Sequence, residues 1–185
     1  MQFHDLGLDG PVRIELERRG DDRGFFARLF CAEEFRQKNL KHDWVQVNNS
    51  LTESKGTIRG LHFQRPPFAE VKLVRCVRGA IFDVAVDLRH GSPTYGQWRG
   101  VELTSENRSM LYIPEGFGHG FQALTDDSEI IYFNSAVYAP DLEGGLKFDD
   151  DSVAIDWPMP AIGLSDRDSR LPNLAGLKPI LLPSD

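Results

Sequence analysis

The sequence predicts an all-β protein built from antiparallel strands, arranged as a sandwich or a barrel. Three observations lead to this prediction. Short stretches rich in β-branched and aromatic residues follow one another closely between residues 12 and 135. Glycine and proline, with 17 and 11 residues, separate these stretches. Helical patterns are too sparse for alternating strand and helix units. We find no repeat, linker or low-complexity tract, so we predict a single domain over residues 1–185.

The N-terminal part of the chain alternates strand-like and turn-like segments. The Asp-Asp-Arg-Gly sequence at residues 21–24 predicts a turn, because these residue types favour turn geometry. Residues 32–40 predict a helix, because Glu33 and Glu34 would lie in its first turn, where the helix dipole favours acidic side chains. The strands expected here comprise residues 12–17, 25–30 and 44–48.

Two strands around a proline-broken loop form the centre of the predicted sheet. Residues 56–63 and 71–77 both alternate small or apolar residues with polar ones, which indicates strands with one face inward. Pro66-Pro67 interrupts this pattern and requires a loop. His62 would therefore end one strand, and Lys72 would begin the next strand near it.

Strict alternation also predicts which side chains share a face. In the first central strand, one face would carry Thr57, Arg59, Leu61 and Phe63, and the other would carry Ile58, Gly60 and His62. In residues 80–88, one face would carry Ile81, Asp83, Ala85 and Asp87, and the other Phe82, Val84, Val86 and Leu88. Asp83 and Asp87 are candidate site residues if their face is interior; the alternative is structural pairing with arginines.

The remaining strands follow at short intervals, and the C-terminal part lacks a strand pattern. Residues 91–96 predict a turn. After Tyr138 the chain is rich in aspartate, glycine and proline, with a short helix expected near residues 165–170. The strands expected in this half comprise residues 80–88, 97–103, 110–113, 119–124 and 129–135.

Composition disfavours several classes of partner. The chain has 21 basic and 28 acidic residues, a net charge of −7, which argues against nucleic acid and anionic membranes as partners. The central stretch nevertheless has a basic excess, which suggests a small anionic ligand, although solvated strand arginines are the commoner case. The basic residues concerned are Arg59, Arg65, Lys72, Arg75 and Arg78.

The cysteines and the N-terminus predict the compartment. Cys31 and Cys76 form neither a spaced metal motif nor a disulfide framework, and free thiols fit a reducing cytosol. The N-terminus lacks the apolar core of a signal peptide, and no apolar run approaches membrane-spanning length. We therefore expect a cytoplasmic protein with no membrane partner.

His62 and Lys72 together could support proton abstraction from carbon. A histidine titrates near neutral pH and can remove such a proton if the resulting anion is stabilised. An ammonium group beside a developing enolate oxygen provides that stabilisation. The alternative, which these residues alone leave open, is a hydrogen-bonded core histidine and a solvated lysine.

Two motifs resemble the signatures of the cupin superfamily of β-barrels. The Pro-x-Gly-x-x-His sequence at residues 114–119 resembles the second signature. The central stretch resembles the first signature, but Gln64 stands where a second histidine is expected. The resemblance implies a jelly-roll barrel with few short helices. Because the set of metal ligands is incomplete and Lys72 would add a positive charge beside it, we expect no metal and no other cofactor.

Longer motifs resemble one branch of this superfamily, the dTDP-4-dehydrorhamnose 3,5-epimerase (RmlC-like) family. The resemblance extends from about residue 11 to about residue 172. It rests on Asp22-Arg23-Gly24-Phe25-Phe26, Arg59-Gly60-Leu61-His62-Phe63-Gln64, Lys72-Leu73-Val74, Gly79, residues 83–89, Gly91-Ser92-Pro93-Thr94, residues 114–121, Tyr132, Tyr138, Ile155-Asp156-Trp157-Pro158 and Leu164-Ser165-x-x-Asp168. The implied substrate is a nucleotide-diphosphate 4-keto-6-deoxy sugar, in a pathway to lipopolysaccharide, capsule or deoxysugar-decorated metabolites.

The resemblance also implies roles for individual residues. His62 would remove a proton next to the ketone, supported by a hydrogen bond to Asp168. Lys72 would stabilise the enolate oxygen, and Tyr132 would return a proton on the opposite face. The expected substrate-binding residues are Arg23 and Arg59 at the diphosphate, His119 at the substrate or diphosphate, and Phe26, Arg28, Gln46, Asn48 and Tyr138. The implied assembly is a homodimer in which strands cross between subunits.

Some positions depart from the family pattern, mostly where the nucleotide would lie. Arg28 replaces a glutamate, and Glu70 replaces a glutamine two residues before Lys72. The family's Gln-Asp-Asn segment is Gln-Val-Asn at residues 46–48, and its Trp-Asn-Asp-Pro segment is Phe-Asp-Asp-Asp at residues 148–151. These changes suggest that the machinery is retained but the nucleotide or sugar differs.

Three alternatives to a dTDP-sugar double epimerase follow. The first is a mono-epimerase, or a ketoisomerase on the same scaffold, including enzymes acting on a CDP- or GDP-linked 4-keto sugar. The second is a sugar-nucleotide-binding cupin without turnover, which would have no need of all four catalytic residues. The third is a metal-dependent cupin oxygenase, which the missing second histidine disfavours.

Overall fold

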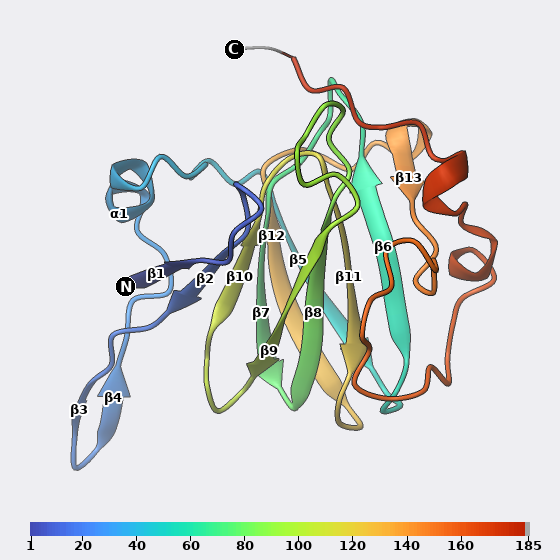
Figure 1. The fold of residues 1–185 in the computed structure, drawn as a ribbon. Coiled ribbons are helices and arrows are strands. Elements are labelled where there is room, and N and C mark those ends of the chain that lie inside the picture. The colour runs from blue at the N-terminus through green and yellow to red at the C-terminus, as the bar shows by residue number, and fades with distance from the viewer. Residues whose placement is uncertain (184–185) are drawn as a thin grey trace.

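Two antiparallel β-sheets pack face to face in the computed structural model, which describes residues 1–183 (Figure 1). The six-stranded sheet has the order β1 (Gln2–Asp5), β2 (Val12–Glu15), β10 (Met110–Ile113), β7 (Lys72–Arg78), β12 (Ser128–Asn134) and β5 (Gln46–Thr52). The five-stranded sheet has the order β13 (Glu143–Gly145), β6 (Ile58–Gln64), β11 (Phe117–Ala123), β8 (Ala80–Asp87) and β9 (Trp98–Thr104). The predicted all-β, cupin-like fold is confirmed.

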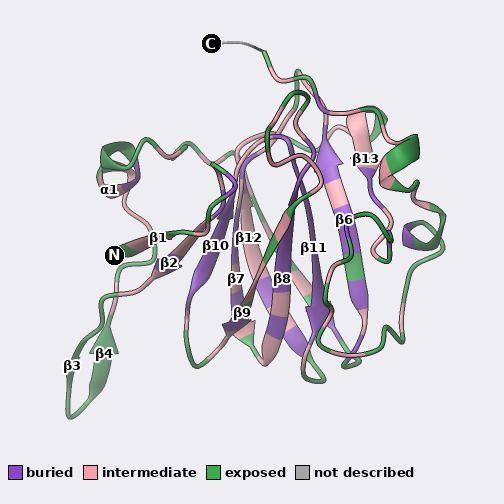
Figure 2. Cartoon of the chain, viewed as in Figure 1, coloured by how far each residue is buried: buried purple, intermediate pink, exposed green. Residues whose placement is uncertain are grey.

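The central strands carry buried residues on both faces, because apolar clusters lie both between the two sheets and outside each of them. The cluster between the sheets includes Val74 and Leu111 from one sheet and Ile81 and Phe121 from the other. A second cluster lies between the five-stranded sheet and the C-terminal segments, and a third between the six-stranded sheet and α1 (Ala32–Gln37). The strands between these layers are therefore largely buried (Figure 2).

Most predicted elements are found, with boundaries shifted by a few residues. Helix α1 ends at Gln37 and not at residue 40, because Asn39 adopts a left-handed φ of 57° that a helix cannot continue. The apolar run at residues 25–30 is not a buried strand. Only its start pairs, in an exposed hairpin of β3 (Arg19–Asp21) and β4 (Gly24–Phe26) that projects from the sheets (Figure 1).

A β-bulge in β6 corrects the prediction for its two faces. Strict alternation placed Arg59 and His62 on opposite faces, yet both line the same cavity. On β11, His119 pairs with His62 and Phe121 pairs with Arg59, so two residues of β6 oppose one residue of β11. This extra residue reverses the alternation between the two pairs. Leu61 and Phe63 consequently pack in the outer cluster.

Glycine allows the two strands to approach at the bulge. A Cβ atom on Gly60 would lie 2.6 Å from the Gly120 Cα atom, and Gly60 has a φ of 119° that L-amino acids rarely adopt. A Cβ atom on Gly120 would lie 2.7 Å from the Arg59 carbonyl oxygen. The two glycines therefore permit the bulge that turns Arg59 and His62 toward one cavity.

Candidate active site

A cavity of about 610 Å³ lies between the two sheets and is closed on one side by residues 163–168. This volume is typical of sites that bind small molecules. Seven of the twelve predicted site residues line it. These are Arg59, His62, Lys72, His119, Tyr132, Tyr138 and Asp168.

His62 and Asp168 form a hydrogen-bonded pair at the cavity wall. His62 Nε2 lies 2.7 Å from Asp168 Oδ1, and the Gly60 amide donates to Asp168 Oδ2 at 3.1 Å. Burial would raise the pKa of Asp168, but the bonds from His62 and Gly60 hold this pKa below its usual value. An ionised carboxylate only accepts hydrogen bonds, so Nε2 carries the hydrogen and Nδ1 carries the lone pair. His62 can therefore act as a base through Nδ1.

His119 and Asp83 form a second pair on the neighbouring strands. His119 Nε2 lies 2.7 Å from Asp83 Oδ1, and Asp83 is fully buried. Its other oxygen, Oδ2, has no hydrogen-bond partner within residues 1–183. Asp83 thus faces the interior, whereas Asp87 binds Arg89 in the structural pairing that the sequence left as the alternative.

Lys72 and Tyr132 come from adjacent strands of the six-stranded sheet and supply an ammonium and a phenol. The Lys72 ammonium lies 3.2 Å from the Glu70 carboxylate, and the Lys72 side chain is 12% exposed. Burial raises the pKa of Tyr132, and the negative charge of Glu70 raises it further. The phenol is therefore protonated at neutral pH and available as an acid.

Arg59, on β6, is held by two residues of β5 in the other sheet. Its Nε donates to the Thr52 hydroxyl at 2.9 Å, and Nη2 donates to the Leu51 carbonyl oxygen at 3.1 Å. These bonds fix the guanidinium plane at the cavity wall. A guanidinium has five N–H donors, so it retains donors for an anionic ligand.

Glu143 and Arg167 complete the lining beside Tyr138, and the sequence analysis missed both. The Tyr138 hydroxyl donates to Glu143 at 2.8 Å, and Arg167 forms an ion pair with Glu143 at 2.6 Å. The hydrogen bond to Glu143 raises the pKa of Tyr138. Both residues lie in C-terminal segments with no extended strand pattern, so the sequence carried no signal for their place.

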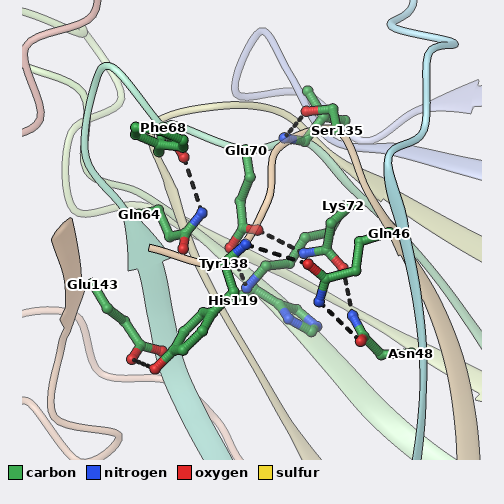
Figure 3. Close-up of polar contacts among 12 residues, drawn as sticks. Gln46, Asn48, Gln64, Phe68, Glu70, Lys72, His119, Ser135, Tyr138 and Glu143 are labelled. Carbon is green, nitrogen blue, oxygen red and sulfur yellow. Dashed lines mark hydrogen bonds and ion pairs between the residues drawn. The ribbon is translucent and has the colours of Figure 1, made fainter. Parts of the chain in front are cut away.

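Gln46 and Asn48 are not among the residues that line the cavity of one chain, and their predicted role in substrate binding stays a prediction. Their side chains belong to an internal network (Figure 3). Gln46 donates to Asn48 at 3.0 Å, and Asn48 donates to Asn134 at 3.0 Å. Gln46 also accepts a hydrogen bond from the Tyr138 amide at 3.3 Å. Within one chain, these hydrogen bonds link β5 to β12 and to the Tyr138 backbone.

Arg23, Phe26 and Arg28 also lie outside the cavity of their own chain, and their predicted role in substrate binding stays a prediction. Arg23 pairs with Asp21 and its side chain is 90% exposed. Phe26 is exposed on the hairpin, and Arg28 pairs with Glu34 at 3.3 Å. The sequence placed these residues by family resemblance, and no contact within residues 1–183 brings them to the cavity.

Residues 1–183 contain no group of three or more histidine, cysteine, aspartate or glutamate side chains arranged to hold a metal ion. In the same residues, no helix has both the length and the apolar character needed to cross a membrane.

The chain is similar to known proteins of one family. A family model described as dTDP-4-dehydrorhamnose 3,5-epimerase matches residues 5–176. The dTDP-4-dehydrorhamnose 3,5-epimerase of Sinorhizobium fredii is 47% identical over 96% of this chain and 91% of its own length. The dTDP-4-dehydrorhamnose 3-epimerase of Streptomyces niveus is 40% identical over 91% of this chain and 81% of its own.

A solved structure gives the same result for the fold. The dTDP-6-deoxy-D-glucose-3,5-epimerase RmlC of Legionella pneumophila, in complex with dTDP-4-keto-L-rhamnose, aligns with a TM-score of 0.92 and 36% sequence identity. The alignment covers 99% of each chain.

Proposed function

Because this chain belongs to the dTDP-4-dehydrorhamnose 3,5-epimerase family, we propose that its cavity inverts the carbons next to the ketone of a nucleotide-linked 4-keto-6-deoxy sugar. The chain is an epimerase, an isomerase of nucleotide sugars. The observation that carries the assignment of the site is the His62–Asp168 pair in one cavity with Lys72 and Tyr132.

The reaction begins with removal of a proton from a carbon that the neighbouring ketone acidifies. His62 Nδ1 takes this proton, and Asp168 stabilises the resulting imidazolium through Nε2. The electron pair of the broken C–H bond forms an enolate, whose oxygen the Lys72 ammonium stabilises. The Tyr132 hydroxyl then donates a proton to the opposite face of the same carbon, which inverts the centre. Solvent restores the two protonation states after each turnover.

The nucleotide carrier is thymidine diphosphate in this proposal. The relatives and the Legionella structure are named for dTDP sugars, so they do not favour the CDP or GDP alternative. Arg59 suits the diphosphate because a guanidinium forms paired hydrogen bonds to phosphate oxygens. His119 pairs with His62 across strands β11 and β6 and would bind the diphosphate or the sugar. The family names include both 3,5- and 3-epimerases; we propose inversion at both carbons.

A homodimer in the cytoplasm accounts for the residues outside the cavity. Phe25 and Phe26 are exposed on the projecting hairpin, a costly arrangement for a free surface. Docking of the hairpin on a second copy would bury them and could carry Arg23 and Arg28 to the partner's cavity. The free thiols Cys31 and Cys76 fit the reducing cytoplasm.

The test is incorporation of solvent deuterium, measured by mass spectrometry, into 4-keto-6-deoxy sugars linked to dTDP, CDP and GDP. We expect exchange at two carbons of the dTDP sugar, and loss of exchange in His62→Ala. The exposed His90 is the matched control, and His90→Ala should exchange like the wild type. Exchange at one carbon would indicate a mono-epimerase, and binding without exchange would indicate a sugar-nucleotide-binding protein.

A further inference from the structure

The carboxylate of Glu70 lies beside Lys72, and the proposed mechanism does not use it. Glu70 Oε1 is 3.2 Å from Lys72 Nζ, and the two side chains are only 9% and 12% exposed (Figure 3). Glutamate is among the residues least often buried, unless a partner compensates its charge. The pair is thus a charged unit at the cavity wall.

The backbone before β7 places Glu70 where it can reach this position. Ser135 receives a hydrogen bond from the Val71 amide at 2.8 Å and donates its own amide to the Val71 carbonyl oxygen at 3.1 Å. These bonds anchor the chain on the residue between Glu70 and Lys72. Both side chains of the pair therefore begin from a fixed backbone.

The second oxygen of Glu70 is also occupied. Asn134 Nδ2 donates to Oε2 at 2.6 Å, and Asn134 Oδ1 accepts from Asn48. The chain of hydrogen bonds continues through Gln46 to the Tyr138 amide. Each member has a partner on both sides, so the network holds the carboxylate in one orientation.

We propose that Glu70 is a positioning residue of the site, which holds the Lys72 ammonium at the cavity wall and sets the charge balance around the Tyr132 hydroxyl. This inference rests on the proposed function, because it assigns Glu70 a role toward two groups of that mechanism. It also assigns a positioning role to Gln46, Asn48 and Asn134, whose hydrogen bonds keep the carboxylate oriented.

The charge balance around Tyr132 involves all charged groups that face it. Burial and the carboxylates of Glu70 and Glu143 raise the pKa of Tyr132, whereas the guanidinium of Arg59 lowers it. The other titratable groups at the cavity are the Lys72 ammonium, the Arg167 guanidinium, the Tyr138 phenol and the two histidine–aspartate pairs. Glu70 is also anchored on the strand that carries Tyr132, because its partner Asn134 lies two residues after Tyr132 on β12.

Two substitutions of Glu70 separate the effect of its charge from the effect of its side-chain length. Glu70→Gln keeps the length of the side chain and removes its charge, whereas Glu70→Asp keeps the charge. The first measurement is the titration of Tyr132 by NMR with ¹³C-labelled tyrosine, assigned among the four tyrosines by Tyr132→Phe. We expect the Tyr132 titration at lower pH in Glu70→Gln and unchanged in Glu70→Asp. An unchanged titration in Glu70→Gln would overturn the inference, even if that variant were less stable.

The second measurement is the rate of deuterium exchange in the same variants. We expect kcat in Glu70→Gln to fall on the order of tenfold with little change in KM, because Lys72 loses a charge-assisted partner that it needs in the transition state. Glu70→Asp should recover part of this loss. Equal kcat values in the wild type and in Glu70→Gln would contradict the proposal that Glu70 positions Lys72. Because the titration needs no substrate, a shifted titration supports the role of Glu70 even if the chosen sugars were wrong.

Discussion

Two histidines of the cavity each donate a hydrogen bond to a buried aspartate, but the two pairs differ. Asp168 uses both oxygens, one toward His62 and one toward the Gly60 amide. Asp83 uses one oxygen toward His119, and its other oxygen has no partner within residues 1–183. The first aspartate therefore fixes the orientation and the tautomer of its histidine more strictly, which fits His62 as the base.

Replacement of Asp168 by asparagine should abolish most of the exchange activity. An amide can donate to Nε2, which would move the hydrogen to Nδ1 and remove the lone pair that faces the substrate. We expect kcat to fall by roughly 10²-fold or more, the usual contribution of a positioned base. Asp166→Asn is the matched control, because Asp166 is 99% exposed two residues away. A wild-type rate in Asp168→Asn would exclude His62–Asp168 as the base.

The same carboxyl should make stability depend on acid pH. The pKa of Asp168 is lowered in the folded protein by His62 and Gly60 despite its burial. Its stabilising contribution is therefore complete above the unfolded pKa of about 3.9 and is lost as the pH falls through the lower, folded pKa. Urea midpoints measured between pH 6 and pH 2.5 should fall less steeply in Asp168→Asn. Parallel curves would show that Asp168 is not paired in solution.

The bulge in β6 determines which side chains of this strand reach the cavity. Without the extra residue, Arg59 and His62 would point to opposite sides of the sheet, one into the cavity and one into the outer cluster. The close contact of Gly60 with Gly120 allows the strands to remain paired around it. A local change of strand register thus places an anion-binding group and a base in one cavity.

Gly60→Ala should be strongly destabilising because of this contact. The new Cβ atom would meet backbone atoms of Gly120 and His119 at 2.6 and 2.7 Å, at a φ that disfavours L-amino acids. We expect a loss of about 3 kcal/mol in the free energy of unfolding. Gly91→Ala is the control, since Gly91 also has a positive φ but nothing within 4 Å, and should lose about 1 kcal/mol. Similar losses in urea denaturation would refute the role of the close approach.

Exposed apolar residues lie on the hairpin and on one edge of the molecule. Phe25 and Phe26 project on the hairpin, and Val45, Val47 and Leu51 are about half exposed on or next to the edge strand β5. Unpaired strand edges with apolar side chains tend to associate. A second copy of the chain is the partner that the family resemblance implies.

A dimer should be visible in solution, and its disruption should affect substrate binding. Light scattering should give twice the mass of one chain for the wild type. Phe26→Ala with Arg23→Ala should weaken the dimer and raise KM more than it lowers kcat, because the four catalytic groups belong to one cavity. Arg99→Ala, on the opposite sheet, is the control. A monomeric wild type with normal KM would contradict this assembly.

The sequence alone predicted the all-β fold, most strands and seven of the residues that line the cavity. Its signals were local: alternation of apolar residues identifies strands, and motif residues such as His62, Lys72 and Asp168 identify the chemistry. These signals could not show that Glu143 and Arg167 line the cavity, because both residues lie in segments without a periodic pattern. The faces of Arg59 and His62 also depended on tertiary structure, because a bulge is defined by pairing with another strand and leaves no mark in the alternation of one strand. The network that joins Gln46 and Asn48 to Glu70 could not be predicted for the same reason, since its hydrogen-bond partners come from distant segments of the chain.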